Sequence, residues 1–110
     1  MFSLATDTEI TQHEGIAALQ RLLEVAHRGT GQSCIAARFL LSLYNGERFP
    51  FDLTDFRCFD LEIFQDCLMV LIMDNQPKRE VHRYFRNGQK IWEQMAVTWS
   101  FSDHDSKSWR

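Results

Sequence analysis

The segment SCIAARFLLSLY, residues 33–44, constrains the fold more than any other part of the chain, because Arg38 is its one charged residue. Its large apolar residues recur at helical spacing. A helix that is apolar around so much of its circumference needs other elements on several sides. We therefore predict a helix over residues 33–45 near the centre of the domain. Its apolar rows are Ile35, Phe39 and Leu43, and Ala36, Leu40 and Tyr44.

Two further segments repeat the helical spacing. Residues 12–28 carry one apolar stripe, and Thr11 with Glu14 fits a capping box at its start. Residues 60–75 carry large apolar side chains that share one face, and we predict that this face packs on the core. The face consists of Leu61, Phe64, Leu68, Leu71 and Ile72, whereas Glu62, Gln65, Asp66 and Met69 are predicted to point away.

The last part of the chain allows two interpretations. Asn87-Gly88 is typical of the turn of a β-hairpin, here over residues 81–93. The spacing of the apolar residues after Gly88 instead indicates a helix over 88–99 with Asn87 as its N-cap. We favour the helix and keep the hairpin as the alternative. The sequence leaves open whether residues 81–86 form helix, strand or loop.

The predicted fold is a compact all-α domain of four main helices, roughly 12–28, 33–45, 60–75 and 88–99. A chain of 110 residues, 45% of them hydrophobic, can bury one core without a metal or disulfide. We expect a frayed segment over 1–10, a single helical domain over 11–101 and a disordered tail over 102–110. The predicted core comprises Leu19, Leu22, Leu23, Ile35, Phe39, Leu40, Leu43, Phe64, Leu68, Leu71, Ile91, Trp92 and Met95.

The loop GTGQS, residues 29–33, only partly matches a phosphate-binding loop. It follows an expected helix instead of a strand, and Gln32 stands where such a loop needs Lys. We predict a helix–helix turn in which Gly29 ends one helix and Thr30 or Ser33 caps the next.

Other sequence signals favour a soluble cytoplasmic protein without cofactors. The N-terminus lacks the features of a signal peptide, and the longest apolar run, from Cys67 to Met73, is too short to span a bilayer. The three cysteines lie far apart, without the spacing of a metal or redox site. The four histidines are scattered, and a catalytic pair such as Cys58 with His82 would have to assemble across the fold. We expect no catalytic residues, and a small enzyme of unknown reaction is the second alternative.

Charge is divided unevenly along the chain. Residues 1–76 carry five Arg against eleven Asp and Glu, whereas residues 77–110 carry seven Lys and Arg against four Asp and Glu. A basic, aromatic-containing segment over 78–90 could contact phosphates, so a nucleic-acid-binding accessory protein is the first alternative function. Its candidate residues are Lys78, Arg79, Arg83, Arg86 and Lys90.

Four short motifs give the chain a resemblance to a known family. They are ALQRLL (18–23), TGQS (30–33), FLL (39–41) and FDLTD (51–55), and EVHRYFRNG followed by an aromatic helix extends the match. Over about residues 15–100 the chain resembles a family of short proteins of unknown function, encoded largely on proteobacterial plasmids, integrative elements and prophages. The resemblance implies a bacterial accessory gene of a mobile genetic element and carries no catalytic residue.

Together with this resemblance, the sequence favours a non-catalytic protein-binding accessory factor. Three phenylalanines surround an expected loop between helices, and a few aromatic or Arg anchors usually dominate the affinity of a protein interface. The partner would be a host or element-encoded protein, or a second copy of the chain. The alternative for these aromatics is a place in the core. The expected interface residues are Phe49, Phe51 and Arg57, with Asp55 and Glu62 at the rim.

Overall fold

The computed structural model describes residues 8–99 and confirms the all-α fold, since this part of the chain contains helices and no strand. The expected tail over 102–110 lies outside the described residues, as do the first seven residues of the segment expected to fray. The α-helices are α1 (Thr8–Ala26), α2 (Ser33–Tyr44), α3 (Leu61–Asn75) and α4 (Gly88–Thr98), and the shorter 3-10 helices are η1 (Leu53–Cys58) and η2 (Val81–Tyr84).

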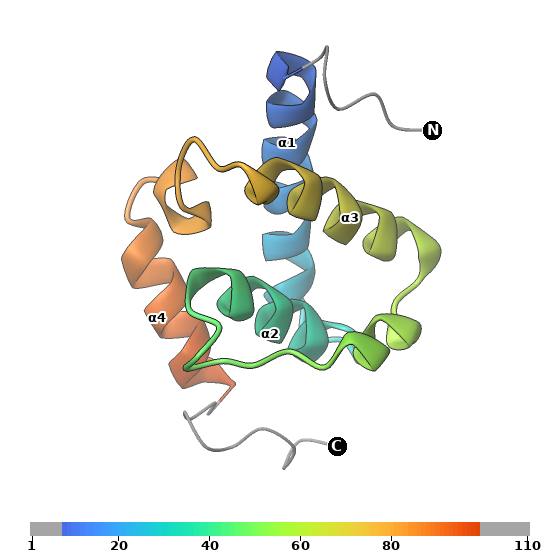
Figure 1. The fold of residues 1–110 in the computed structure, drawn as a ribbon. Helices are drawn as coiled ribbons and strands as arrows, with labels where there is room; N and C mark the ends of the chain where they lie inside the picture. Colours follow the sequence, from blue (N-terminus) through green and yellow to red (C-terminus); the bar gives the residue numbers. More distant parts are fainter. Residues whose placement is uncertain (1–7, 100–110) are drawn as a thin grey trace.

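The helix α2 occupies the centre of the domain, as its composition predicts. It packs against α1, α4 and η2, whereas α3 packs against α1 (Figure 1). Phe39 and Leu40 are buried, and the Trp92 indole Nε1 of α4 donates a hydrogen bond of 3.0 Å to the Leu40 carbonyl. This bond satisfies the one polar atom of a fully buried tryptophan, so it fixes α4 on α2.

The GTGQS segment is a helix–helix turn, as predicted. Gly29 adopts a φ of 77°, in the left-handed region that glycine enters without strain. The Ser33 hydroxyl donates a hydrogen bond of 2.5 Å to the Val25 carbonyl and accepts one of 2.9 Å from the Thr30 amide. The polar groups of the turn therefore bind one another and close the last turn of α1.

Two predicted helix caps differ from the structure. The helix α1 begins at Thr8, so residues 8–10 are helical and Thr11 lies inside the helix rather than at its N-cap. The N-cap position of α2 belongs to Gln32, which makes no capping bond through its side chain. The Gln32 amide instead reaches α3, where its Oε1 accepts a hydrogen bond of 2.7 Å from the Asp60 backbone amide.

The prediction for the packing face of α3 is wrong. The helix instead buries Cys67, Val70 and Met73. The cause is a close crossing with α1, because a Cβ at Gly15 would lie 2.6 Å from the Met73 sulfur. Helices that approach so closely have no room for a row of Leu and Phe between them. Of the predicted core residues, Leu71 is exposed and five are half-buried: Leu23, Leu43, Phe64, Leu68 and Ile91.

The helix predicted over 88–99 is confirmed, and the alternative hairpin does not form. Asn87 precedes α4 with a left-handed φ of 58°, and residues 81–84 form η2. Gly88 lies so close to η2 that a Cβ on it would meet the His82 carbonyl oxygen at 1.6 Å. Asn87-Gly88 therefore forms a tight turn between two helical elements. Such a turn favours Asn and Gly for the same reason as a hairpin turn does, namely their tolerance of positive φ and close backbone contacts.

Candidate functional site

The large apolar side chains of α3 that lie outside the core cluster share one side of the helix, which we call the α3 outer face. Leu61 is 68% exposed and Leu71 is 36% exposed, and no basic residue lies in the helix. Phe64, Leu68 and Ile72 are half-buried and do not belong to the core cluster. In Figure 1 α3 lies at the edge of the fold, on the side away from α4. The α3 outer face consists of Leu61, Phe64, Leu68, Leu71 and Ile72.

A chain of aromatic rings supports one end of this face. The buried Phe39 ring of α2 packs edge-on against Phe51 and Phe56 at centroid distances of 5.5 and 5.6 Å. Phe56, in η1, then packs against Phe64 of α3 at 5.2 Å. The rings form a packed row from the centre of the core to Phe64, so this end of the α3 outer face is supported by buried side chains. Leu53, at the start of η1, is 73% exposed.

The interface residues predicted from the sequence divide between core and surface. Phe49 is 1% exposed and Asp55 is buried, so neither presents its side chain to a partner. Phe51 is half-buried among the aromatic rings, whereas Arg57 and Glu62 are exposed. Arg57 lies in η1, which precedes α3, and Glu62 lies in the first turn of α3.

The buried Asp55 shares its surroundings with a buried arginine. Arg38 is 1% exposed, and its guanidinium Nη1 donates a hydrogen bond of 3.3 Å to the Pro50 carbonyl. Both residues act on Cys34: burial raises the pKa of the Cys34 thiol, the Arg38 charge lowers it and the Asp55 charge raises it. These groups hold the 45–60 loop against α2. Asp52 of the FDLTD motif has a similar local role, since it accepts a hydrogen bond of 2.9 Å from the Thr54 amide.

Acidic residues border the α3 outer face. Asp60 and Glu62 are exposed at its start, and Asp66 forms an ion pair of 2.8 Å with Arg21 of α1. Burial, together with the charge of Glu80, raises the pKa of Asp74 at the far end of the helix to about 6. The segment 60–75 contains four acidic residues and no Lys or Arg. The exposed carboxylates therefore lie at the start of α3, whereas Asp66 is paired with α1 and Asp74 is half-buried.

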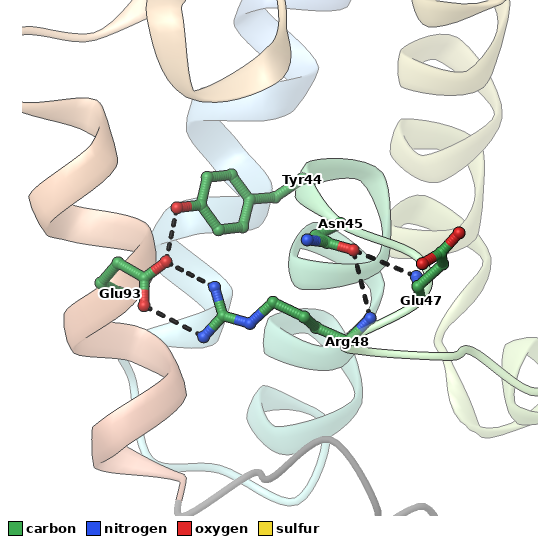
Figure 2. A network of polar contacts seen from close by, with 5 residues as sticks. All are labelled: Tyr44, Asn45, Glu47, Arg48 and Glu93. Carbon is green, nitrogen blue, oxygen red and sulfur yellow. Dashed lines mark hydrogen bonds and ion pairs between the residues drawn. The ribbon is translucent and has the colours of Figure 1, made fainter.

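A second polar cluster joins the end of α2 to α4 (Figure 2). The Glu93 carboxylate accepts hydrogen bonds of 2.7 and 3.2 Å from the Arg48 guanidinium and one of 2.5 Å from the Tyr44 hydroxyl. The bonds from Arg48 and Tyr44 lower the pKa of Glu93, and the bond to Glu93 raises the pKa of Tyr44. Asn45 Oδ1 accepts from the amides of Glu47 and Arg48 and shapes the turn. The cluster holds the loop after α2 against α4. Its donors, on Tyr44 and Arg48, bind the Glu93 carboxylate.

The catalytic pair considered from the sequence does not assemble. Cys58 is exposed at the end of η1, and His82 lies in η2, where its ring packs edge-on against Tyr44 at 4.9 Å. Figure 1 shows η1 beside the start of α3 and η2 beside α4, on opposite sides of the molecule. Within the described part of the chain, no three metal-ligating residues of the His, Cys, Asp and Glu types come together.

The basic residues predicted for nucleic-acid binding all lie on the surface. They are distributed over the loop after α3, over η2 and over the first turn of α4. The Arg79 guanidinium lies 5.8 Å from the centre of the Tyr84 ring. None of the five forms an ion pair with another described residue. The five residues, Lys78, Arg79, Arg83, Arg86 and Lys90, are exposed.

The helical spacing of apolar residues predicts the α3 outer face but places it in the core. The missed signal is that Cys67, Val70 and Met73 form a second apolar row on the same helix. A helix with two apolar rows can bury either one. The Tyr44–Arg48–Glu93 cluster carried no signal, because its members lie up to 49 residues apart in the chain.

No helix in the described residues has the length and apolar character needed to cross a membrane.

No curated protein and no solved structure matches the chain. The sequence profile described as "Family of unknown function (DUF7673)" matches residues 16–100, and the chain therefore belongs to this family.

Proposed function

We propose that the protein is a non-catalytic binding module that docks onto a partner protein through the α3 outer face. The observation that carries the proposal is the exposure of Leu61 and Leu71 on one side of α3, together with the exposure of Leu53 in η1. Among the described residues, Val97 of α4 is the one other large apolar side chain that is exposed to this extent. Contiguous apolar surface of this kind is a common mark of a protein interaction site.

The partner that fits this surface is an amphipathic helix with basic flanks. The apolar row follows α3 from its first to its third turn, and a second helix can lay its own apolar ridge along such a row. The acidic residues of segment 60–75 would then face Lys or Arg of the partner. A second copy of the chain fits less well, because α3 against α3 would bring acidic residues together.

The family resemblance supports a biological setting for this proposal. It implies an accessory gene of a mobile genetic element, and the partner would then be a host protein or another product of the element. Arg57 and Glu62, which the sequence analysis also selected, are exposed and would contribute to the rim. Phe49 and Asp55 support the fold instead.

Two synthetic helical peptides test the proposal. Both are as long as α3 and carry leucines on one face, and they differ in having Lys or Glu on the other. We expect the Lys peptide to bind at least about tenfold more tightly than the Glu peptide in fluorescence anisotropy, with the difference shrinking as salt is added. The double variant Leu61→Gln/Leu71→Gln should lose about tenfold or more in affinity for the Lys peptide, because these side chains would be buried by it.

The matched control is Val97→Gln, which removes an equally exposed apolar side chain from α4. It should leave the affinity for the Lys peptide unchanged. Equal binding of the two peptides, or equal loss in the control, would contradict the proposal. Light scattering of the free protein provides a further check, since a dimer that Leu61→Gln/Leu71→Gln dissociates would show that the face binds a second copy instead.

A further inference from the structure

The segment 78–90 differs in charge from the rest of the molecule. It contains five Lys and Arg and one Glu, which gives a net charge of +4. The whole chain has a net charge of -3, so the remaining residues carry -7. Exposed charges of both signs usually alternate on a protein surface, and clustered like charges repel one another. Five exposed cations that form no ion pair with another described residue give this region a positive potential that attracts anions.

The fold holds these cations in one region. The first turn of α4 contacts the His82 carbonyl of η2 at Gly88, so Arg83 of η2 and Lys90 of α4 lie on two elements in direct contact, and Arg86 lies in the turn that joins them. Val81 is fully buried and anchors η2, and the Phe85 ring packs against Trp92 at 5.8 Å. Figure 1 places η2 and the start of α4 away from the start of α3. The basic segment and the acidic start of α3 are thus separate surfaces.

We propose that residues 78–90 bind the phosphate backbone of a nucleic acid. The cations are spread over a loop, η2 and the first turn of α4, which suits an extended polyanion better than a single small anion. Lys and Arg contacts to phosphates supply affinity without reading the base sequence. The surrounding charge of -7 opposes binding, so the affinity is modest and depends steeply on salt. The protein would then hold a partner on α3 and nucleic acid on η2 and α4.

Fluorescence anisotropy with a labelled single-stranded DNA and with its duplex tests this inference. Binding to at least one of them at low salt should weaken by an order of magnitude or more between about 50 and 200 mM salt. Arg83→Ala should weaken binding several-fold and reduce the slope of log K against log salt by about 0.7 to 0.9, which corresponds to one lost phosphate contact. Arg83→Lys should retain that slope, because the contact is electrostatic.

The control is Arg28→Ala, which removes one exposed Arg outside the basic segment. It should leave the salt slope unchanged, and an equal effect of Arg28→Ala and Arg83→Ala would overturn the inference. So would the absence of binding to both DNAs, or binding to anionic lipid vesicles without binding to DNA. Leu61→Gln/Leu71→Gln should bind DNA like the parent, so this inference and the proposed protein interface succeed or fail separately.

Discussion

At the scale of single residues, small side chains decide how the helices approach one another. Gly15 allows α1 to cross α3 beside Met73, and Gly88 allows α4 to begin against the His82 carbonyl. The second approach is the closer, because a Cβ at Gly88 would meet a backbone oxygen that cannot rotate away. Asn87 contributes a left-handed φ of 58° next to it, and Asn tolerates this conformation better than most residues.

The substitution Gly88→Ala tests this close approach. We expect it to lower the free energy of unfolding by roughly 3 kcal/mol or more, since α4 and η2 must separate to admit a methyl group. The control is Gly31→Ala, because a Cβ at Gly31 meets no atom within 4 Å. It should change stability by less than about 1 kcal/mol in denaturant unfolding. Equal effects of the two substitutions would contradict the packing described for Gly88.

Asp74 makes stability depend on pH in an unusual direction for a carboxylic acid. Its pKa is about 6 in the folded protein and is expected near its ordinary value of 3.8 in the unfolded chain. Between these values the folded state binds more protons, so this group's contribution to stability falls as pH rises from about 4 to 6. We expect Asp74→Asn to gain stability relative to the parent as pH rises from 4 to 7 in urea unfolding. A stability difference that stays constant over this range would contradict the assignment.

At the scale of elements, the sequence predicts the helices better than it predicts their packing. The composition of residues 33–44 places α2 at the centre, because so apolar a helix has no alternative to burial. The helix α3 has two apolar rows, and the spacing of the residues favoured the wrong one. The crossing at Gly15, which selects the other row, depends on a residue 58 positions from Met73. Spacing along one segment contains no information about such a contact.

The candidate sites show the same division. All five cations of 78–90 are exposed, and their segment could be recognised from composition alone. Composition does not show whether Phe49 lies in an interface, because an aromatic residue in a loop can pack in the core as well as on the surface. In the structure Phe49 is buried. Arg48 and Tyr44 contact Glu93 only because the fold brings distant residues together, so no sequence motif predicts their cluster.

At the scale of the whole molecule, two surfaces of opposite charge lie on different elements. The segment 60–75 combines four acidic residues with the apolar row of α3, and the segment 78–90 holds most of the basic residues of the C-terminal third. Under the two proposals made above, the protein would bring a basic protein segment and a polyanion together. The proposed protein interface depends on one structural feature, namely that α3 buries Cys67, Val70 and Met73 and leaves Leu61 and Leu71 exposed.

Denaturant unfolding of two variants tests this claim most directly. Leu61→Gln/Leu71→Gln changes the exposed row, and Val70→Ala truncates the fully buried row. The account predicts that the double variant unfolds within about 1 kcal/mol of the parent, as expected for surface positions. Val70→Ala should lose roughly 2 kcal/mol, because it deletes buried methyl groups and leaves a cavity. A loss of several kcal/mol in the double variant, with Val70→Ala close to the parent, would show that α3 packs through the opposite face and would contradict the account.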